Sequence, residues 1–225
     1  MIELRDVSFE YDARPVLRQV SANLAEHRIG LVGANGSGKS TLARLCHGLL
    51  LPTAGQVLVN GHDTRRDAAA ARSQVGFVFQ DPDIQIIMPT VAEDLAFSLR
   101  PSGLSKQEIS AQVDDWLGRY DLVSHRDHPA HLLSGGQKQL LAIAAVLITQ
   151  PQIVIFDEPT TLLDLRNKHR IMAVIAALDQ QVVMVSHDLD LLSEFDRILV
   201  VDAGQIIADD SPRAALDVYR RAALG

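Results

Sequence analysis

The chain alternates between short apolar runs and longer segments in which apolar residues recur with helical spacing. Residues 2–9 alternate between apolar and polar side chains, which predicts a strand with one buried face, and 16–24 predicts a second strand. The run 153–156 is continuously apolar and 182–186 is apolar up to its final Ser186, as is typical of strands buried on both faces. Further strands are predicted at 28–32, 56–61, 75–79, 197–201 and 205–208, the last two as a hairpin.

Helices are predicted mainly by the residues that begin them. Thr90 with Glu93 and Ser105 with Glu108 match the capping box, in which a hydroxyl and a carboxylate three residues apart satisfy the first amides of a helix. Helices should therefore begin at 91 and 106, and a third such signal at 134–137 opens a very apolar helix that ends before 151. Other helices are predicted at 41–47, 66–73 and 166–178, and from 212 with Ser211 as N-cap.

These elements predict an α/β domain that spans 1–225. We interpret 1–83 and 151–225 as its α/β core and 84–150 as a helical insert, because strand signals are confined to the two flanking parts. No repeat or low-complexity linker separates the insert from the core.

Composition narrows the function classes. With 47% hydrophobic and 22% charged residues the chain has the make-up of an ordinary globular protein, and its net charge of −7 gives no nucleic-acid footprint. No run approaches the roughly 18 apolar residues of a membrane helix, and the first residues lack the apolar block of a signal peptide. Cys46 is the only cysteine, so no internal disulfide can form. We expect a cytosolic protein.

The run 33–40 matches the phosphate-loop pattern of Gly, four residues, then Gly, Lys and Ser, between a predicted strand and a predicted helix. Glycines let the backbone approach phosphate oxygens, and the amides of a helix N-terminus attract anions. Lys39 adds a positive charge for the β- and γ-phosphates, and the Ser40 hydroxyl can bind Mg²⁺. The residues assigned to this nucleoside-triphosphate site are Gly33, Asn35, Gly36, Ser37, Gly38, Lys39, Ser40 and Thr41.

Two acidic residues, Asp157 and Glu158, directly follow the apolar strand 153–156. Ligands of open α/β sheets bind at the carboxyl ends of the strands, so these acids should lie beside the phosphate loop. Asp157 can hold Mg²⁺ through water, and Glu158 can polarise an attacking water. His187 ends a second buried strand in the same way.

The segment 133–137 suggests a second anion site. Ser134 caps a helix whose first residues are Gly135 and Gly136, so several amides lie open at the positive end of a helix dipole. A cap alone does not need two glycines, since glycine weakens the helix that it starts.

In order along the chain, 33–40, Gln80, 133–137, 153–158, Asp164 and His187 resemble the ATP-binding-cassette (ABC) ATPase family. The resemblance implies an α/β fold: a P-loop NTPase (RecA-like) core with an N-terminal antiparallel β subdomain and a helical insert subdomain. It also implies ATP and Mg²⁺ as cofactors and a head-to-tail dimer with a second copy as partner. Each ATP then lies between one subunit's phosphate loop and the other's signature motif.

The same resemblance implies roles for individual residues. Ser134, Gly135, Gly136 and Gln137 would grip the γ-phosphate of ATP held by the partner. Gln80 would join Mg²⁺ and the attacking water, His187 would contact the γ-phosphate and position Glu158, and Asp164 would lie at the dimer seam. Tyr11 would stack on the adenine ring. Without the resemblance, Tyr11 could equally be an aromatic residue at the protein surface. No catalytic position is substituted, which implies an active ATPase.

Two features fit the family pattern less well. Leu140 stands where many members carry Arg, which puts the packing of the signature helix in question. His125, His128 and His131 invite a metal interpretation, but Pro129 interrupts them and no acid or cysteine completes a ligand set.

The stretches 79–85 and 90–97 resemble the ATPases of energy-coupling-factor importers, which take up vitamins and transition metals. Together with the run 160–167 and the short C-terminus, they make the chain similar to ATPases dedicated to biotin import, with cobalt or nickel import as the alternative. The partners implied are an integral membrane coupling subunit and a substrate-binding membrane subunit, with the ATPase at the cytoplasmic face of the cell membrane. Competing classes are a soluble ATPase acting on nucleic acid and a non-hydrolysing nucleotide switch.

Overall fold

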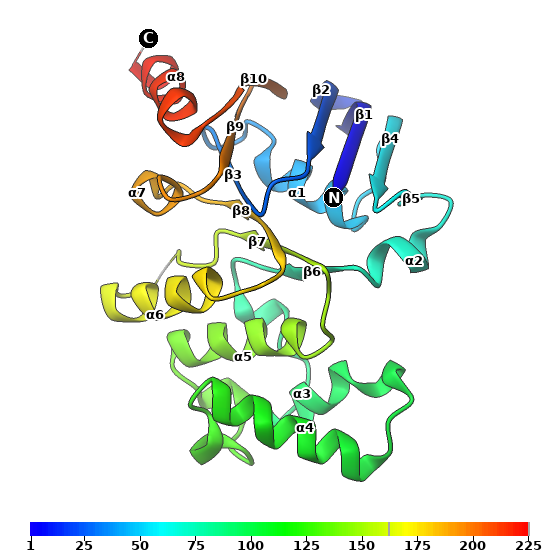
Figure 1. The fold of residues 1–225 in the computed structure, drawn as a ribbon, viewed down its shortest axis with the longest axis vertical. Coiled ribbons are helices and arrows are strands. Elements are labelled where there is room, and N and C mark those ends of the chain that lie inside the picture. Colours follow the sequence, from blue (N-terminus) through cyan, green and yellow to red (C-terminus); the bar gives the residue numbers. More distant parts are fainter. Residues whose placement is uncertain (162, 225) are drawn as a thin grey trace. The chain divides into compact units, whose positions relative to one another are not determined.

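The computed structural model describes residues 1–161 and 163–224, which form two units (Figure 1). The first, called the core unit here, contains 1–77, 152–158 and 178–225, and the second, the helical unit, contains 78–151 and 159–177. Leu162 belongs to the run 160–167 considered above and lies outside the described residues. The α/β fold predicted from the sequence is confirmed.

One sheet of the core unit is antiparallel, in the order β2-β1-β4-β5. Its β1–β2 hairpin turns at Asp12 and Ala13, which both have positive φ, as two-residue hairpin turns of type I′ require. Because this turn is so short, Tyr11 is still part of β1 and ends it. The strands are β1 (Ile2–Tyr11), β2 (Arg14–Leu24), β4 (Ala54–Val59) and β5 (His62–Asp63).

The other sheet has the order β10-β9-β3-β8-β7-β6. Strand β3 pairs in parallel with β8 and β9, β7 pairs in parallel with β8, and β10 is antiparallel to β9. All five residues of β7 are buried, as the continuous apolar run predicted. The strands are β3 (Arg28–Val32), β6 (Val75–Val78), β7 (Ile153–Asp157), β8 (Gln181–Val185), β9 (Arg197–Asp202) and β10 (Gln205–Asp210).

Each helix of the core unit follows one of these strands in the chain. They are α1 (Lys39–His47), α2 (Ala68–Arg72), α7 (Leu189–Leu192) and α8 (Pro212–Leu224). Helix α8 begins at Pro212 as predicted, whereas α7 and β5 are too short to leave a periodic signal and were not predicted.

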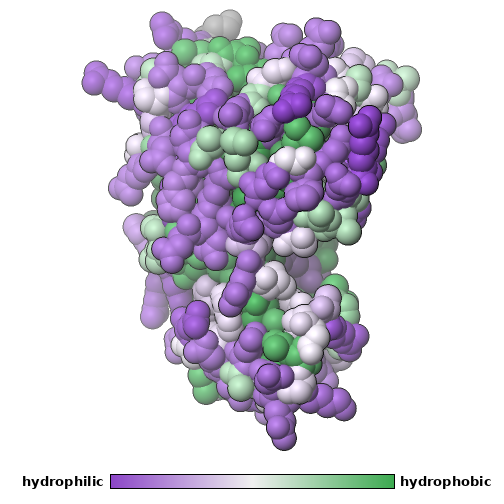
Figure 2. Space-filling view, turned by 45° about the vertical axis from the view of Figure 1, so that its right-hand side comes forward, coloured by the Kyte–Doolittle hydropathy of each residue, from purple (hydrophilic) through white to green (hydrophobic). Residues whose placement is uncertain are grey.

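The helical unit contains α3 (Val91–Ser98), α4 (Lys106–Arg119), α5 (Gly135–Leu147) and α6 (Leu165–Ala176), with short 3₁₀ turns at 82–84, 100–102, 123–125 and 130–132. The starts predicted at 91 and 106 are confirmed, and full capping boxes are present at Thr90, Ser105 and Ser134. Among the described residues, no helix combines the length and apolar character that crossing a membrane requires. Hydrophilic residues cover most of the face drawn in Figure 2, and hydrophobic residues emerge in small groups between them.

Helix α1 carries a histidine near its C-terminus that should make the stability of the protein depend on pH. Burial, with the positive charge of Arg72, lowers the pKa of His47 to about 4, and its ring meets Phe77 edge to face at 5.7 Å. The unfolded chain takes up this proton at the ordinary histidine pKa of about 6.5. Stability is therefore full above pH 6.5 and falls as the pH drops toward 4, by up to about 3 kcal/mol.

Denaturant unfolding from pH 4 to 7.5 measures this effect. His47→Gln should flatten the acid limb relative to the natural chain, whereas His169→Gln, a change at an exposed position on α6, should leave it intact. An acid limb unchanged by His47→Gln would contradict the assignment.

Candidate functional site

The phosphate loop lies between β3 and α1. A Cβ on Gly33 would come within 2.1 Å of the Val201 carbonyl oxygen, so only glycine fits against β9 at this point. Gly38 has φ +108° and directly precedes α1, a conformation that side chains rarely adopt. The amides at the start of α1 are thereby presented to a bound anion.

Lys39 is almost completely buried within this loop, with 5% of its surface exposed. Its Nζ donates to the carbonyl oxygens of Gly33 at 2.9 Å and Ala34 at 2.8 Å. Burial lowers the pKa of this amine, and the carboxylates of Glu158 and Asp157 oppose that shift. Two loop carbonyls therefore orient the ammonium group, and a third N–H is left for a phosphate oxygen.

Ser40, near the start of α1, and Asp157, at the end of β7, are joined by a hydrogen bond within the core unit. The Ser40 hydroxyl donates to Asp157 Oδ1 at 2.8 Å, and Asp157 keeps only 4% of its side chain exposed. The Arg44 guanidinium, one turn further along α1, lies 3.7 Å from the second carboxylate oxygen. A hydroxyl and a carboxylate are hard oxygen ligands of the kind that Mg²⁺ prefers, so this pair suits that ion.

Glu158 and His187 follow the neighbouring parallel strands β7 and β8, where Asp157 is in register with Val185. Their side chains approach to 3.0 Å between Glu158 Oε1 and His187 Nε2. Glu158 has a φ of +56°, a left-handed conformation that costs a non-glycine residue about 1–3 kcal/mol. Such strain persists where the surrounding structure imposes it, and it aims the carboxylate at His187. The sequence placed both residues at strand ends but gave no sign of this backbone conformation.

Tyr11 lies at the end of β1 with 43% of its surface exposed. Its ring meets that of Phe9 edge to face at 4.7 Å between centroids. The structure therefore presents it as a supported surface aromatic.

In the helical unit, Ser134 caps α5. Its side chain accepts from the Gln137 amide, and Gln137 Oε1 accepts from the Ser134 amide at 2.9 Å. Ser134 and Gly135 are exposed, whereas Gly136 is buried. We call residues 134–137 the signature segment.

The two glycines of this segment have different reasons to be glycine. A Cβ on Gly136 would lie 2.3 Å from the Asn167 side chain, while Gly135 has only Leu163 nearby, at 3.9 Å. Asn167 is fixed by Asp164, which accepts from its backbone and side-chain nitrogens at 2.8 and 3.1 Å. Gly136 is thus required by packing, and Gly135 leaves open space at the helix start. Asn167 gave no signal in the sequence.

Gln80 is exposed at the start of the loop that follows β6. The preceding residue, Phe79, is held at both backbone groups: its N–H donates to Gln85 Oε1 at 3.1 Å, and its carbonyl accepts from Gln139 at 3.4 Å. Gln85 also donates to the Ala142 carbonyl at 2.9 Å. Within the helical unit, Phe79 is therefore tied to helix α5. The sequence did not indicate a role for the buried Gln139, because a single glutamine in an otherwise apolar helix carries no signal that it is buried.

Leu140 and the histidines His125, His128 and His131 also lie in this unit. Leu140, where many family members carry Arg, is buried with 1% of its surface exposed, so the apolar side chain is packed. His125 and His128 meet edge to face at 5.7 Å. In the described part of the chain, no three His, Cys, Asp or Glu side chains are grouped as metal ligands. His125 instead contacts Gln137.

A family model described as "ABC transporter" matches residues 17–161. The chain belongs to the ABC transporter family. It is 60% identical over 220 residues to an ABC transporter ATP-binding protein of Deinococcus radiodurans, covering 98% of this chain and 97% of the relative. It is 43% identical to the biotin transport ATP-binding protein BioM of Rhizobium etli (99% of each chain). Identity to the cobalt import ATP-binding protein CbiO of Syntrophus aciditrophicus is 40% (100% and 84%).

Solved structures of ABC proteins have the same fold as this chain. CbiO1 of Clostridium perfringens, described as part of the transporter complex CbiONQ, superposes with a TM-score of 0.84 at 30% identity, over 99% of this chain and 94% of that one. A dimeric ATP-binding cassette, MJ0796, bound to ADP and phosphate, gives 0.83 at 28% identity (95% and 99%). The ABC ATPase is therefore an enzyme that hydrolyses ATP, and its predicted resemblance to the energy-coupling-factor type is confirmed.

Proposed function

We propose that this ABC ATPase hydrolyses ATP at composite sites in a head-to-tail homodimer. We propose that it thereby powers import of a micronutrient, with biotin as the first candidate. The observation that carries the catalytic part is the 3.0 Å contact between Glu158 and His187, which follow β7 and β8. Strand β8 also pairs with β3, which leads into the phosphate loop. This arrangement brings a base and a phosphate-binding loop to one edge of one sheet.

The core unit supplies the chemistry. The loop amides and Lys39 hold the β- and γ-phosphates, and Ser40 and Asp157 hold Mg²⁺, which neutralises phosphate charge when bound. Glu158 accepts a proton from the attacking water, and His187, 3.0 Å away, orients Glu158 and can donate to the γ-phosphate. Tyr11 stacks on the adenine, and Gln80 orients the water and the metal.

The helical unit supplies the second half of a site on another chain. The exposed residues Ser134 and Gly135 lie at the N-terminus of α5, where the helix dipole favours a bound phosphate. Asp164 lies next to this segment through Asn167 and belongs to the dimer seam. The chain that binds an ATP through Lys39 therefore depends on its partner to close the site.

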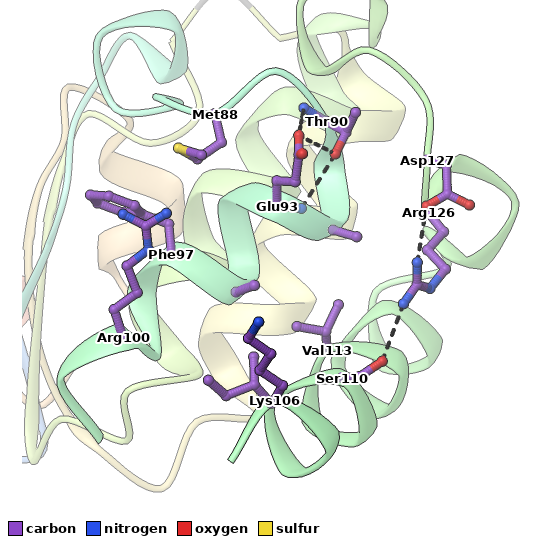
Figure 3. Close-up of a pocket in the computed structure, with 13 residues that line it drawn as sticks. Met88, Thr90, Glu93, Phe97, Arg100, Lys106, Ser110, Val113, Arg126 and Asp127 are labelled. Atoms are coloured by element: carbon purple, nitrogen blue, oxygen red, sulfur yellow. Dashed lines mark hydrogen bonds and ion pairs between the residues drawn. The ribbon is translucent and has the colours of Figure 1, made fainter. Parts of the chain in front are cut away.

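A groove of about 680 Å³ in the helical unit suits the cytoplasmic segment of a membrane coupling subunit (Figure 3). Met88, Phe97 and Val113 give it an apolar floor, and Arg100 and Lys106 give it a positive rim. Such a groove takes a helix with an apolar face and an acidic flank. Docking there places the ATPase at the cytoplasmic face of the membrane.

The wall of this groove is fixed by a buried carboxylate. Asp94 accepts from the backbone amides of Ile87 and Met88 at 2.9 and 3.0 Å. Burial raises the pKa of Asp94, and these two hydrogen bonds oppose that shift. The loop that begins near Gln80 is thereby held against α3.

Reversing the charge of the groove rim should break docking while ATP binding continues. Arg100→Glu is expected to abolish copurification with the membrane subunits, because Arg100 is exposed and stacks over Phe97 at 4.7 Å. Arg119→Glu, at an exposed position on α4 outside the groove, should leave copurification intact. Equal loss from both variants would contradict the groove as the docking site.

The transported substrate is tested by uptake in cells that lack this chain. Labelled biotin uptake should fall and be restored by the natural chain but not by Glu158→Gln. The similarity to the cobalt import protein makes cobalt the second candidate. Loss of cobalt uptake with biotin uptake unchanged would make cobalt, and not biotin, the transported substrate.

A further inference from the structure

Gln137 connects the signature segment to His125, a residue to which the sequence assigns no part in ATP binding. The Gln137 side chain has its Oε1 2.9 Å from the Ser134 backbone nitrogen and its Nε2 3.1 Å from His125 Nε2. On the other side of the ring, His125 Nδ1 lies 3.1 Å from Ser124 Oγ. Because a backbone N–H can only donate, the amide oxygen of Gln137 must face Ser134, and its NH₂ group must face His125.

The direction of the hydrogen bond between Gln137 and His125 determines which imidazole nitrogen carries the proton. The Gln137 NH₂ group donates, so His125 Nε2 accepts and Nδ1 carries the hydrogen, which it donates to Ser124 Oγ. The hydrogen bonds therefore run one way, from the Ser134 amide through Gln137 and His125 to Ser124. Without an acceptor at the position of Nε2, the Gln137 amide could turn over and lose its bond to Ser134.

His125 is held in place by the residue after it. Arg126 donates from Nε to Asp114 at 2.8 Å and from its second terminal nitrogen to Ser110 Oγ at 3.3 Å, both on α4. Its backbone carbonyl accepts from Ala92 at the start of α3 at 2.9 Å. Figure 3 shows the Arg126 side chain reaching from its loop to Ser110. The histidine acceptor is thus fixed from two helices.

We propose that His125 is a positioning residue for ATP hydrolysis. By accepting from Gln137 it holds the signature segment in the shape that binds the γ-phosphate of an ATP on the second protomer. The inference rests on the proposed function of the signature segment. It predicts that a change at His125 acts on the partner's nucleotide and leaves ATP binding to its own phosphate loop unchanged.

Two substitutions separate the acceptor from the rest of the side chain. His125→Asn keeps a donor toward Ser124 but has no atom at the position of Nε2, whereas His125→Gln reaches that position with an amide oxygen. In the dimeric ATPase with Mg²⁺, His125→Asn should lower kcat about tenfold with the Kd of ATP unchanged, and His125→Gln should stay within about threefold of the natural chain. His131→Asn, an exposed neighbour, is the matched control. Equal kcat values for Asn and Gln would overturn the proposal.

A mixed dimer locates the effect. One chain carries Lys39→Ala and the other Ser134→Arg, so the working site uses the signature segment of the first and the phosphate loop of the second. His125→Asn should lower the rate when it is added to the Lys39→Ala chain and be silent in the other chain, whose signature segment is already disabled. Equal loss in both placements would show a purely structural role. If Ser134→Arg alone leaves hydrolysis intact, the composite site itself fails, a result distinct from failure at His125.

Discussion

Glu158→Gln is expected to lower kcat for ATP hydrolysis by about 10²- to 10⁴-fold while leaving ATP binding intact. The substitution keeps the shape of the side chain and its contact distance to His187 but removes the group that accepts the proton of the attacking water. Since closure would no longer be followed by hydrolysis, ATP and Mg²⁺ should trap the dimer. Single-turnover hydrolysis and size-exclusion chromatography with ATP measure the two effects.

The control for this prediction is Glu194→Gln, at an exposed position just after α7 in the same unit. It should hydrolyse ATP at the natural rate. Hydrolysis that survives Glu158→Gln at a similar rate would refute Glu158 as the base, and loss of ATP binding in the same variant would point to a structural effect of its strained backbone.

Ser134→Arg is expected to lower hydrolysis at least about a hundredfold and to leave the Kd of ATP unchanged. Ser134 and Gly135 are exposed in this chain, and we propose that they complete a site on another. A large cation there removes the cap of α5 and fills the space of the γ-phosphate, and losing one phosphate-binding donor typically costs that much in rate.

Ser105→Arg is a close control, because it destroys an equivalent capping box on α4 in the same unit. Both variants should lose about 1 kcal/mol of stability from the missing cap, but only Ser134→Arg should lose hydrolysis. If the two variants were equally active, the signature segment would be an ordinary helix start.

Local signals predicted the fold well where they were strong. The helices beginning at 91, 106, 135 and 212 start where their caps predict, because a cap satisfies amides within one turn of the same segment. The buried strand 153–157 was equally plain from its apolar run. Helix α7 and strand β5 were missed, since they are too short for a periodic pattern to develop.

The sequence indicated which residues belong to the candidate site, but only part of how they are arranged in space. Strand order brings Glu158 and His187 together, a meeting that the family resemblance implied. The left-handed backbone of Glu158 is imposed by tertiary structure and has no signature in the sequence. The support of Gly136 by Asn167 and of Gln137 by His125 joins residues far apart in the chain, so no local pattern could reveal it.

If each catalytic site needs two chains, two differently disabled variants should complement each other. Lys39→Ala should lose ATP binding and Ser134→Arg should lose hydrolysis, so each variant alone should be inactive. Mixed in equal amounts, they should regain hydrolysis, because one of the two sites in a mixed dimer then has an intact phosphate loop and an intact signature segment. A mixture as inactive as its components, or full-rate hydrolysis by a strictly monomeric natural chain, would contradict the claim.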